Sequence, residues 1–129
     1  MAQPRQGVTL DVVDVLVVDD QPAFRAVARA LVSVTPDLCL VAEAETGEQA
    51  VDVATMLRPS VVLMDVNLPG MSGIEAARRI VAADPAVKVV LMSTYAAGDL
   101  PADALTAGIA GYLRKEDLTP DALTRLLAP

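Results

Sequence analysis

The sequence contains no histidine and no tryptophan, and among its 129 residues there are only two tyrosines, one phenylalanine and one cysteine. Without histidine the chain lacks the usual general base, the commonest metal ligand and any phosphohistidine carrier. Chemistry in this chain must therefore use carboxylates, hydroxyls and lysine. The scarcity of aromatic residues leaves Val, Leu and Ala to build the interior, and that usage is typical of a parallel sheet covered by helices.

A single cysteine excludes a disulfide framework, which favours a reducing cytoplasm as the location of the protein. We expect Cys39, which lies in the apolar run Leu38 to Val41, to be a small buried thiol rather than a reactive one. No apolar run approaches 18 residues, and no charged-then-apolar leader is present. The sequence therefore predicts a chain that neither spans a membrane nor is exported.

Basic residues are few and scattered, since ten Lys and Arg stand against seventeen Asp and Glu, for a net charge of −7. Binding the phosphate backbone of a nucleic acid requires a basic stripe, which this sequence lacks. We therefore expect no direct contact between this segment and nucleic acid. The length fits one domain, which we assign to residues 12–129, preceded by a flexible N-terminal arm of residues 1–11 without periodicity.

Short apolar runs of strand length alternate with helical patterns along the domain. The runs are rich in Leu and in β-branched residues, and they are Val13 to Val18, Leu38 to Ala42, Val61 to Met64, Val87 to Met92 and Ile109 to Leu113. Between the first two runs the apolar residues recur with a period of 3.6, which indicates a helix with Arg25 and Arg29 facing outward. Its predicted buried face consists of Phe24, Val27, Ala28, Leu31 and Val32.

Four further helices follow from start and stop signals. Capping boxes at Thr46 to Gln49 and at Ser72 to Glu75 open the second and third helices, which end before Pro59 and Pro85. A short fourth helix is expected at Leu100 to Thr106. The fifth is expected at Asp121 to Leu127, with Thr119 as N-cap and Pro120 at its first position.

This order of elements is (βα)5. Right-handed crossovers then predict an α/β fold with a doubly wound parallel five-stranded sheet, and we expect the flavodoxin-like strand order 2-1-3-4-5. In such sheets a site forms outside the carboxyl ends of the strands, where the strand order reverses. The residues that follow each strand are therefore the candidates for function.

Polar side chains stand where four of the apolar runs stop. Singly, each has an ordinary structural explanation, because an Asp often begins a turn and a Lys at a strand end is usually solvated. Together they would meet at one edge of the sheet, so we expect one site with three acids, a hydroxyl and an ammonium. The polar residues at the four strand ends are Asp19 and Asp20, Asp65, Ser93 and Thr94, and Arg114 and Lys115.

The segments VLVVDDQP, VVLMDVNLPGMSG, LMSTYAAG and GYLRKED resemble, in order, spacing and strand position, the motifs of receiver domains of bacterial two-component response regulators. The resemblance covers nearly the whole chain. The segments Gln21 to Arg25 and Gly111 to Asp117 are most similar to receivers of the subfamily that carries a C-terminal helix-turn-helix. Many receivers have a proline directly after the lysine, whereas Glu116 stands here, so a cis peptide bond is not assumed at that position.

The resemblance implies a role for each polar residue. Asp65 would be the phosphoacceptor, Lys115 would bind the phosphoryl group, and Asp19 and Asp20 would be the acidic pair that serves Mg²⁺. Mg²⁺ prefers oxygen ligands, and Asp20, Asp65 and the backbone carbonyl of Asn67 suit it, with Asp19 bonding a metal-bound water. The lysine would act as a mobile point charge on the phosphoryl oxygens.

The resemblance also implies a switch. Ser93 would be the switch hydroxyl, Tyr112 the aromatic switch position, and Tyr95 would cover the phosphoryl group and lengthen its lifetime. The donor would be a sensor histidine kinase or a phosphotransfer protein. The output partner, which the sequence does not identify, would bind the face of the fourth helix, fifth strand and fifth helix. A homodimer is also compatible with the sequence.

Two alternatives differ in class from a regulatory, non-enzymatic phosphoacceptor. A haloacid-dehalogenase-like phosphatase also carries a nucleophilic Asp at a strand end, but it typically needs a second acid two positions later, where Asn67 stands. A structural interaction module with a vestigial site would lack part of the set of acids, hydroxyl and lysine, and none is missing. We therefore expect a receiver domain.

Overall fold

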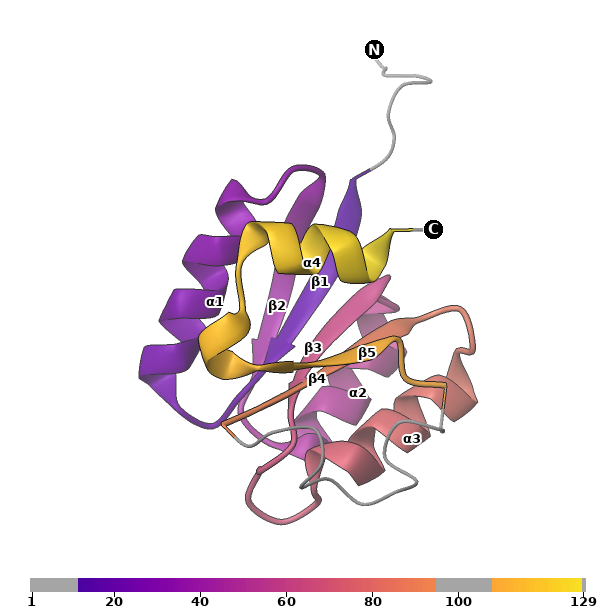
Figure 1. The fold of residues 1–129 in the computed structure, drawn as a ribbon. Coiled ribbons are helices and arrows are strands. Elements are labelled where there is room, and N and C mark those ends of the chain that lie inside the picture. Colours follow the sequence, from indigo (N-terminus) through magenta and orange to yellow (C-terminus); the bar gives the residue numbers. More distant parts are fainter. Residues whose placement is uncertain (1–11, 95–107, 129) are drawn as a thin grey trace.

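A computed structural model describes residues 12–94 and 108–128, which form a five-stranded parallel sheet with helices on both faces (Figure 1). The strand order β2-β1-β3-β4-β5 confirms the predicted fold. The strands are β1 (Val13–Val18), β2 (Leu38–Ala44), β3 (Val61–Asp65), β4 (Lys88–Ser93) and β5 (Gly111–Arg114).

Within residues 12–94 and 108–128, two pairs of helices cover the sheet. Figure 1 shows α1 and α4 on one face and α2 and α3 on the other. The α-helices are α1 (Pro22–Val34), α2 (Gly47–Leu57), α3 (Gly73–Ala83) and α4 (Pro120–Leu127), and a 3₁₀ turn, η2 (Lys115–Asp117), follows β5. The helix expected at Leu100 to Thr106 and the arm of residues 1–11 lie outside the described residues. None of the described helices is both long and apolar enough to cross a membrane.

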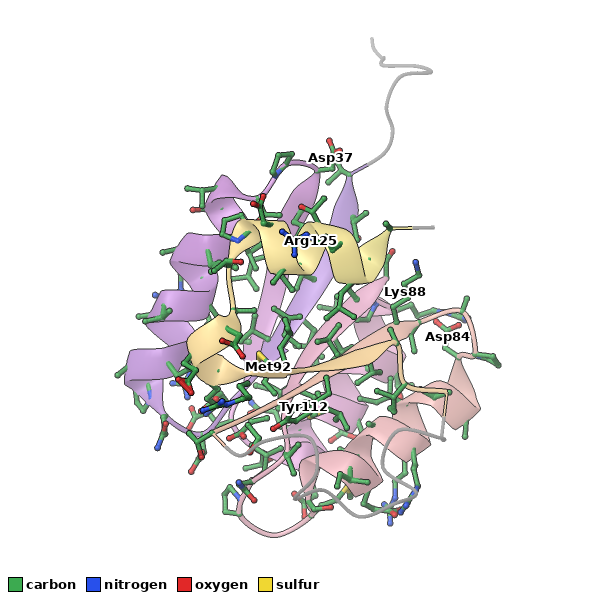
Figure 2. The ribbon with its side chains drawn as sticks, viewed as in Figure 1. Asp37, Asp84, Lys88, Met92, Tyr112 and Arg125 are labelled. Carbon is green, nitrogen blue, oxygen red and sulfur yellow. The ribbon has the colours of Figure 1, made fainter. Side chains whose placement is uncertain are left out.

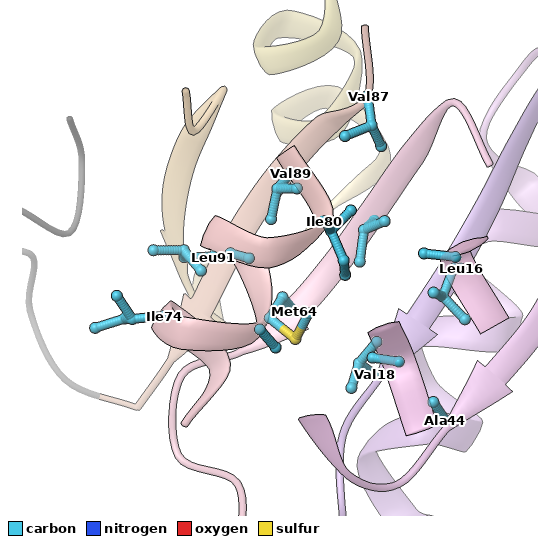
Figure 3. Close-up of a cluster of buried hydrophobic side chains, with 14 of the residues drawn as sticks. Leu16, Val18, Ala44, Met64, Ile74, Ile80, Val87, Val89 and Leu91 are labelled. Carbon is cyan, nitrogen blue, oxygen red and sulfur yellow. The ribbon is translucent and has the colours of Figure 1, made fainter. Parts of the chain in front are cut away.

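The core lies in two layers, because the strands are buried on both faces and their side chains alternate between them. Along β1, Leu16 and Val18 pack towards α2 and α3, whereas Val15 and Val17 pack towards α1 and α4. Figure 3 shows the first layer, where Leu16, Val18 and Met64 lie with Ile80 and Leu91. Two covered faces explain why the strand sequences are apolar at nearly every position.

Both predicted capping boxes are only partly as expected. The Thr46 hydroxyl accepts a hydrogen bond from the backbone N–H of Gln49 (3.0 Å), and the Ser72 hydroxyl accepts one from the backbone N–H of Glu75 (3.1 Å). The returning halves of the capping boxes differ from prediction. The Gln49 side chain accepts from the backbone N–H of Glu45, and the Glu75 carboxylate pairs with arginines in its own helix.

A Ser72→Ala variant is expected to lower the free energy of unfolding by about 1 kcal/mol, because the first turn of α3 loses its side-chain acceptor. Urea denaturation measures this change. Ser33→Ala is the matched control, since its hydroxyl bonds a carbonyl within α1 and alanine is the better helix former. An equal loss in both variants would contradict the assignment of Ser72 as a cap.

Three burial predictions were wrong. Cys39 is exposed, because β2 is an edge strand and Cys39 pairs with the exposed Asp14 at the amino end of the strands. Val27 is 54% exposed. Arg25, predicted to face outward, instead turns towards the sheet edge, where its side chain is 15% exposed. The buried face of α1 is therefore rotated towards Arg25 and away from Val27.

Candidate functional site

The carboxyl ends of β1, β3, β4 and β5 meet at one edge of the sheet and carry the predicted polar residues. Asp19 follows β1, Asp65 is the last residue of β3, Ser93 is the last residue of β4, and Lys115 opens η2 directly after β5. A pocket of about 160 Å³ opens at this edge. It is lined by Asp20, Gln21, Asp65, Asn67, Thr94 and Lys115.

Asp19 is fully buried beneath this pocket. Its backbone N–H donates to the carbonyl of Ala44 (3.0 Å), and its carboxylate Oδ1 accepts from the backbone N–H of Gln21 (2.8 Å). The second oxygen, Oδ2, has no hydrogen bond of good geometry within the described part of the chain, but it lies 2.6 Å from Lys115 Nζ. The ion pair with Lys115 is therefore what compensates the burial of this charge.

Asp65 ends β3 with only 3% of its surface exposed. Its Oδ1 accepts from the backbone N–H of Asn67 (3.2 Å), and its Oδ2 lies 3.5 Å from Lys115 Nζ. The ammonium thus contacts two acids from two different strands. The carboxylate is aimed at the pocket because β3 pairs with both β1 and β4 and the turn after it bonds Asp65 Oδ1.

The carboxyl group of Asp65 has its pKa raised to about 6. Burial is the largest cause, because it disfavours the charged form, and the negative charge of Asp19 adds to it. The ammonium of Lys115 and the N–H of Asn67 oppose the rise. The group is therefore mostly ionised at pH 7.5 yet held in its charged form at a cost in free energy.

The first turn of α3 lies in close contact with the backbone of Asp65. The N–H of Gly73 donates to the carbonyl of Val66 (3.0 Å), and a Cβ on Gly73 would lie 1.8 Å from the Asp65 carbonyl oxygen. Only a residue without a side chain fits here. The connection between β3 and α3 is thus held in place at both ends, and this holds the Asp65 carboxylate in place.

Three carboxylates converge at the pocket, as expected from their strand positions. Asp19, Asp20 and Asp65 each offer an oxygen, and these oxygens all lie within 4.8 Å of one another. Asp20 is exposed, whereas the other two are buried. An all-oxygen donor set with concentrated negative charge fits a hard divalent cation such as Mg²⁺.

The other predicted residues differ in burial and in whether they line the pocket. Ser93 is fully buried, and its neighbour Thr94 lines the pocket. Tyr112 on β5, labelled in Figure 2, is partly buried and packs against the core layer between the sheet and helices α2 and α3. Tyr95 lies outside the described residues. The Lys115–Glu116 peptide bond is trans, as is every other described one.

Two residues that the sequence did not indicate belong to this site. The guanidinium of Arg25 donates to the backbone carbonyl of Asp19 (2.9 Å), and its Nε lies 3.4 Å from Glu43 Oε1 on β2. The ring of Phe24 lies with its centroid 4.5 Å from Lys115 Nζ. The helical period assigned Phe24 to the core, and no sequence signal marks a contact between its ring and a lysine 91 positions later.

The fold and the pocket define a doubly wound α/β domain with an acidic site at the carboxyl edge of its sheet. The family of the response regulator receiver domain matches residues 15–128. The chain belongs to this family, and it is therefore a receiver domain of the kind found in the response regulators of bacterial two-component systems. The resemblance stated from the motifs is confirmed.

Curated relatives agree with this family. The chain is 34% identical over 113 residues to the nitrate/nitrite response regulator protein NarL of Escherichia coli K12, covering 88% of this chain and 52% of NarL. It is 41% identical over 101 residues to the response regulator GacA of Pseudomonas protegens, covering 78% of this chain and 47% of GacA. The chain thus spans about half the length of these relatives.

Solved structures agree as well. A LuxR-family two-component response regulator from Aurantimonas sp. SI85-9A1 superposes with a TM-score of 0.79 at 32% identity, covering 88% of this chain and 81% of that one. The response regulator domain of Thermotoga maritima CheB superposes with a TM-score of 0.78 at 28% identity, covering 89% and 93%.

Proposed function

We propose that this receiver accepts a phosphoryl group on Asp65, in a Mg²⁺-dependent reaction, from the phosphohistidine of a sensor histidine kinase or phosphotransfer protein in the cytoplasm. The observation that carries the proposal is the position of Lys115. Its ammonium lies 2.6 Å from Asp19 and 3.5 Å from Asp65, at the base of a pocket at the sheet edge. A buried acid that contacts a cation beside open space suits a nucleophile for phosphoryl transfer.

The transfer needs a positioned nucleophile and positive charge on the phosphoryl oxygens, with little other assistance. A carboxylate oxygen of Asp65 forms the new bond to phosphorus while the donor's nitrogen–phosphorus bond breaks and its electron pair leaves with the imidazole. Lys115, already in contact with Asp65, moves with its charge onto the incoming oxygens. Ser93 donates a hydroxyl hydrogen bond to the phosphorylated site and is the switch hydroxyl. The domain acts on itself rather than on a substrate pool.

Mg²⁺ fits the three carboxylates, together with the backbone carbonyl of Asn67, and when bound it neutralises charge on the phosphoryl oxygens. The same ion relieves the repulsion between Asp19, Asp20 and Asp65. For a dissociation constant near ~1 mM, ~10 mM Mg²⁺ is expected to raise the free energy of unfolding by about 1.4 kcal/mol. Thermal melts with and without the metal measure this gain.

Asp20→Asn is expected to remove most of the stabilisation by Mg²⁺, because it deletes an exposed carboxylate at the mouth of the pocket. The exposed Asp14, at the opposite end of β1, provides the control: Asp14→Asn keeps the full gain. If Mg²⁺ stabilised the Asp20→Asn protein as much as wild type, the three acids would not form the metal site.

The output is proposed to pass through β5 and the helices beside it. Tyr112 lies on β5 in contact with the core layer, so a change at Ser93 reaches it by local packing. The switched face includes α4 and the segment Leu100 to Ala107, and Tyr95 is proposed to shield the phosphoryl group; both the segment and Tyr95 lie outside the described residues. The partner is a protein, either another domain or a second copy of this chain.

The decisive experiment is phosphorylation by acetyl phosphate with Mg²⁺, followed by mass measurement of the intact protein. Wild type is expected to gain one phosphoryl group, stable in acid and labile in alkali as an acyl phosphate. Asp65→Asn is expected to gain none, whereas Asp14→Asn labels normally. Labelling of Asp65→Asn at the wild-type level would refute the acceptor, and an unlabelled wild type would favour a vestigial interaction module.

A further inference from the structure

The single phenylalanine of the chain lies against Lys115, the cation that contacts both buried acids of the site. Phe24, in the first turns of α1, has its ring centroid 4.5 Å from Lys115 Nζ. The side chain of Lys115 is only 11% exposed, so most water has been removed from this contact. An ammonium at this distance from a ring face is attracted by the electrons of the ring, and the attraction grows as water is excluded.

The ring has a fixed position because the start of α1 is tied to Asp19. The backbone N–H of Gln21, the N-cap of α1, donates to Asp19 Oδ1, and the Arg25 guanidinium donates to the Asp19 carbonyl. Phe24 lies between these two attachments and packs against the core layer of α1 and α4. The helix therefore presents the ring to the same small volume in which Asp19 holds the ammonium.

Lys115 thus contacts two different kinds of group. Asp19 Oδ2 and Asp65 Oδ2 supply charge at 2.6 and 3.5 Å, and the Phe24 ring supplies an apolar surface that attracts cations. Two carboxylates alone would leave a flexible four-carbon side chain free to follow either acid or to move into solvent. A ring beside them restricts where the ammonium can go.

We propose that Phe24 is a positioning residue whose ring holds the Lys115 ammonium at the base of the pocket, beside Asp19 and Asp65. The ring confines the lysine before any phosphoryl group arrives and keeps it within reach when the negative charge at Asp65 increases. The role in phosphoryl transfer depends on the proposed function, whereas the confinement of the lysine does not. The segment Gln21 to Arg25 therefore both begins α1 and positions groups of the site.

The first test measures how easily Lys115 reacts, without any phosphorylation. The chain has only two lysines, and Lys88 lies at the amino end of β4, at the far end of the sheet from the pocket (Figure 2). Brief treatment with acetic anhydride, read by peptide mass, gives the acetylation rate of Lys115 relative to Lys88. Phe24→Leu is expected to raise this ratio about tenfold, which lies between the effects of an exposed and of a fully desolvated cation–π contact.

Two variants separate ring chemistry from packing. Phe24→Tyr keeps a ring face and is expected to keep the wild-type ratio. Leu31→Ala loosens α1 in the same core layer without touching Lys115, and is also expected to keep it. An unchanged ratio in Phe24→Leu, a raised ratio in Phe24→Tyr, or an equal rise in Leu31→Ala would each overturn the proposal.

The second test measures the rate of labelling by acetyl phosphate with Mg²⁺. Phe24→Leu is expected to label about tenfold more slowly than wild type, and Phe24→Tyr at close to the wild-type rate. An equal slowing in Leu31→Ala would overturn the proposal, because loose packing would then explain it. If wild type took no label while the acetylation ratios followed expectation, the phosphoacceptor function would fail and the placement of Lys115 by Phe24 would stand.

Discussion

An Asp65→Asn variant is expected to be more stable than wild type, by up to about 3 kcal/mol at pH 7.5 in EDTA. The reason is that burial and the charge of Asp19 raise the pKa of the Asp65 carboxyl from 3.8 to about 6 in the folded protein. Holding this group ionised therefore costs the folded state free energy that the unfolded state does not lose. Asparagine has nearly the same shape and carries no charge.

The dependence on pH follows from the same rise in pKa. Between about pH 4 and pH 6 the folded protein binds more protons at Asp65 than the unfolded chain does, so wild-type stability falls as the pH increases. The loss is complete above the folded pKa and absent below the unfolded one. The advantage of Asp65→Asn should therefore grow from near zero at about pH 4 to its full value at pH 7.5.

Urea denaturation in EDTA at several pH values measures this advantage. Asp20→Asn is the companion variant, because Asp20 also belongs to the acidic cluster but is exposed, and its gain is expected to be smaller. A less stable Asp65→Asn protein at pH 7.5 would mean that the attraction of Lys115 outweighs the burial of the acid. If the gain in stability of Asp65→Asn were independent of pH, the titration of Asp65 could not be its cause.

Gly73→Ala is expected to destabilise the protein by about 3 kcal/mol or more, because the new Cβ would lie 1.8 Å from the Asp65 carbonyl oxygen. The obstructing atom belongs to the backbone of a central strand, so relief requires α3 to move away from β3. That movement also displaces Asp65. Labelling by acetyl phosphate should therefore fall further than the folded fraction does.

Gly70→Ala provides the matched comparison in the same loop. Gly70 has a φ of +72°, which alanine adopts only with strain, and its nearest neighbour is the flexible end of the Glu48 side chain, 3.1 Å from the added Cβ. We expect a loss of about 1 to 2 kcal/mol and near-normal labelling of the folded protein. If Gly73→Ala were no worse than Gly70→Ala, the close approach of α3 would not be a requirement of the fold.

The sheet and its helices could be predicted because local signals agree with the global arrangement. A run such as Val13–Val18 is apolar at nearly every position since both faces of the sheet are covered, and the hydroxyls of Thr46 and Ser72 mark where helices begin. Handedness and short connections predict a doubly wound sheet, and the resemblance to receiver domains implies its strand order. The convergence of Asp19, Asp20 and Asp65 required only that β1 and β3 be parallel and adjacent. Lys115 follows β5, which is separated from β3 by β4, and its long side chain reaches the two buried acids from there.

What could not be predicted depends on geometry that has no local signature. Val27 and Arg25 exchange the burial expected of them, because a rotation of α1 about its axis depends on where Asp19 presents its carbonyl. Cys39 looks buried by its apolar neighbours, yet it lies near the amino end of the edge strand β2, opposite the exposed Asp14 of β1. The contact between Phe24 and Lys115 joins segments far apart in sequence, and periodicity describes neighbours along one element only.

The irregularity of the edge strand β2 affects how readily this protein aggregates at high concentration. Its register against β1 shifts between Val15 and Leu16, so that Leu40 and Ala42 pair with consecutive residues and Val41 is left over between them. At the opposite edge, β5 has only four residues. Neither edge offers another chain a long, straight row of free backbone groups, and the domain thereby resists polymerising into aggregates by strand addition.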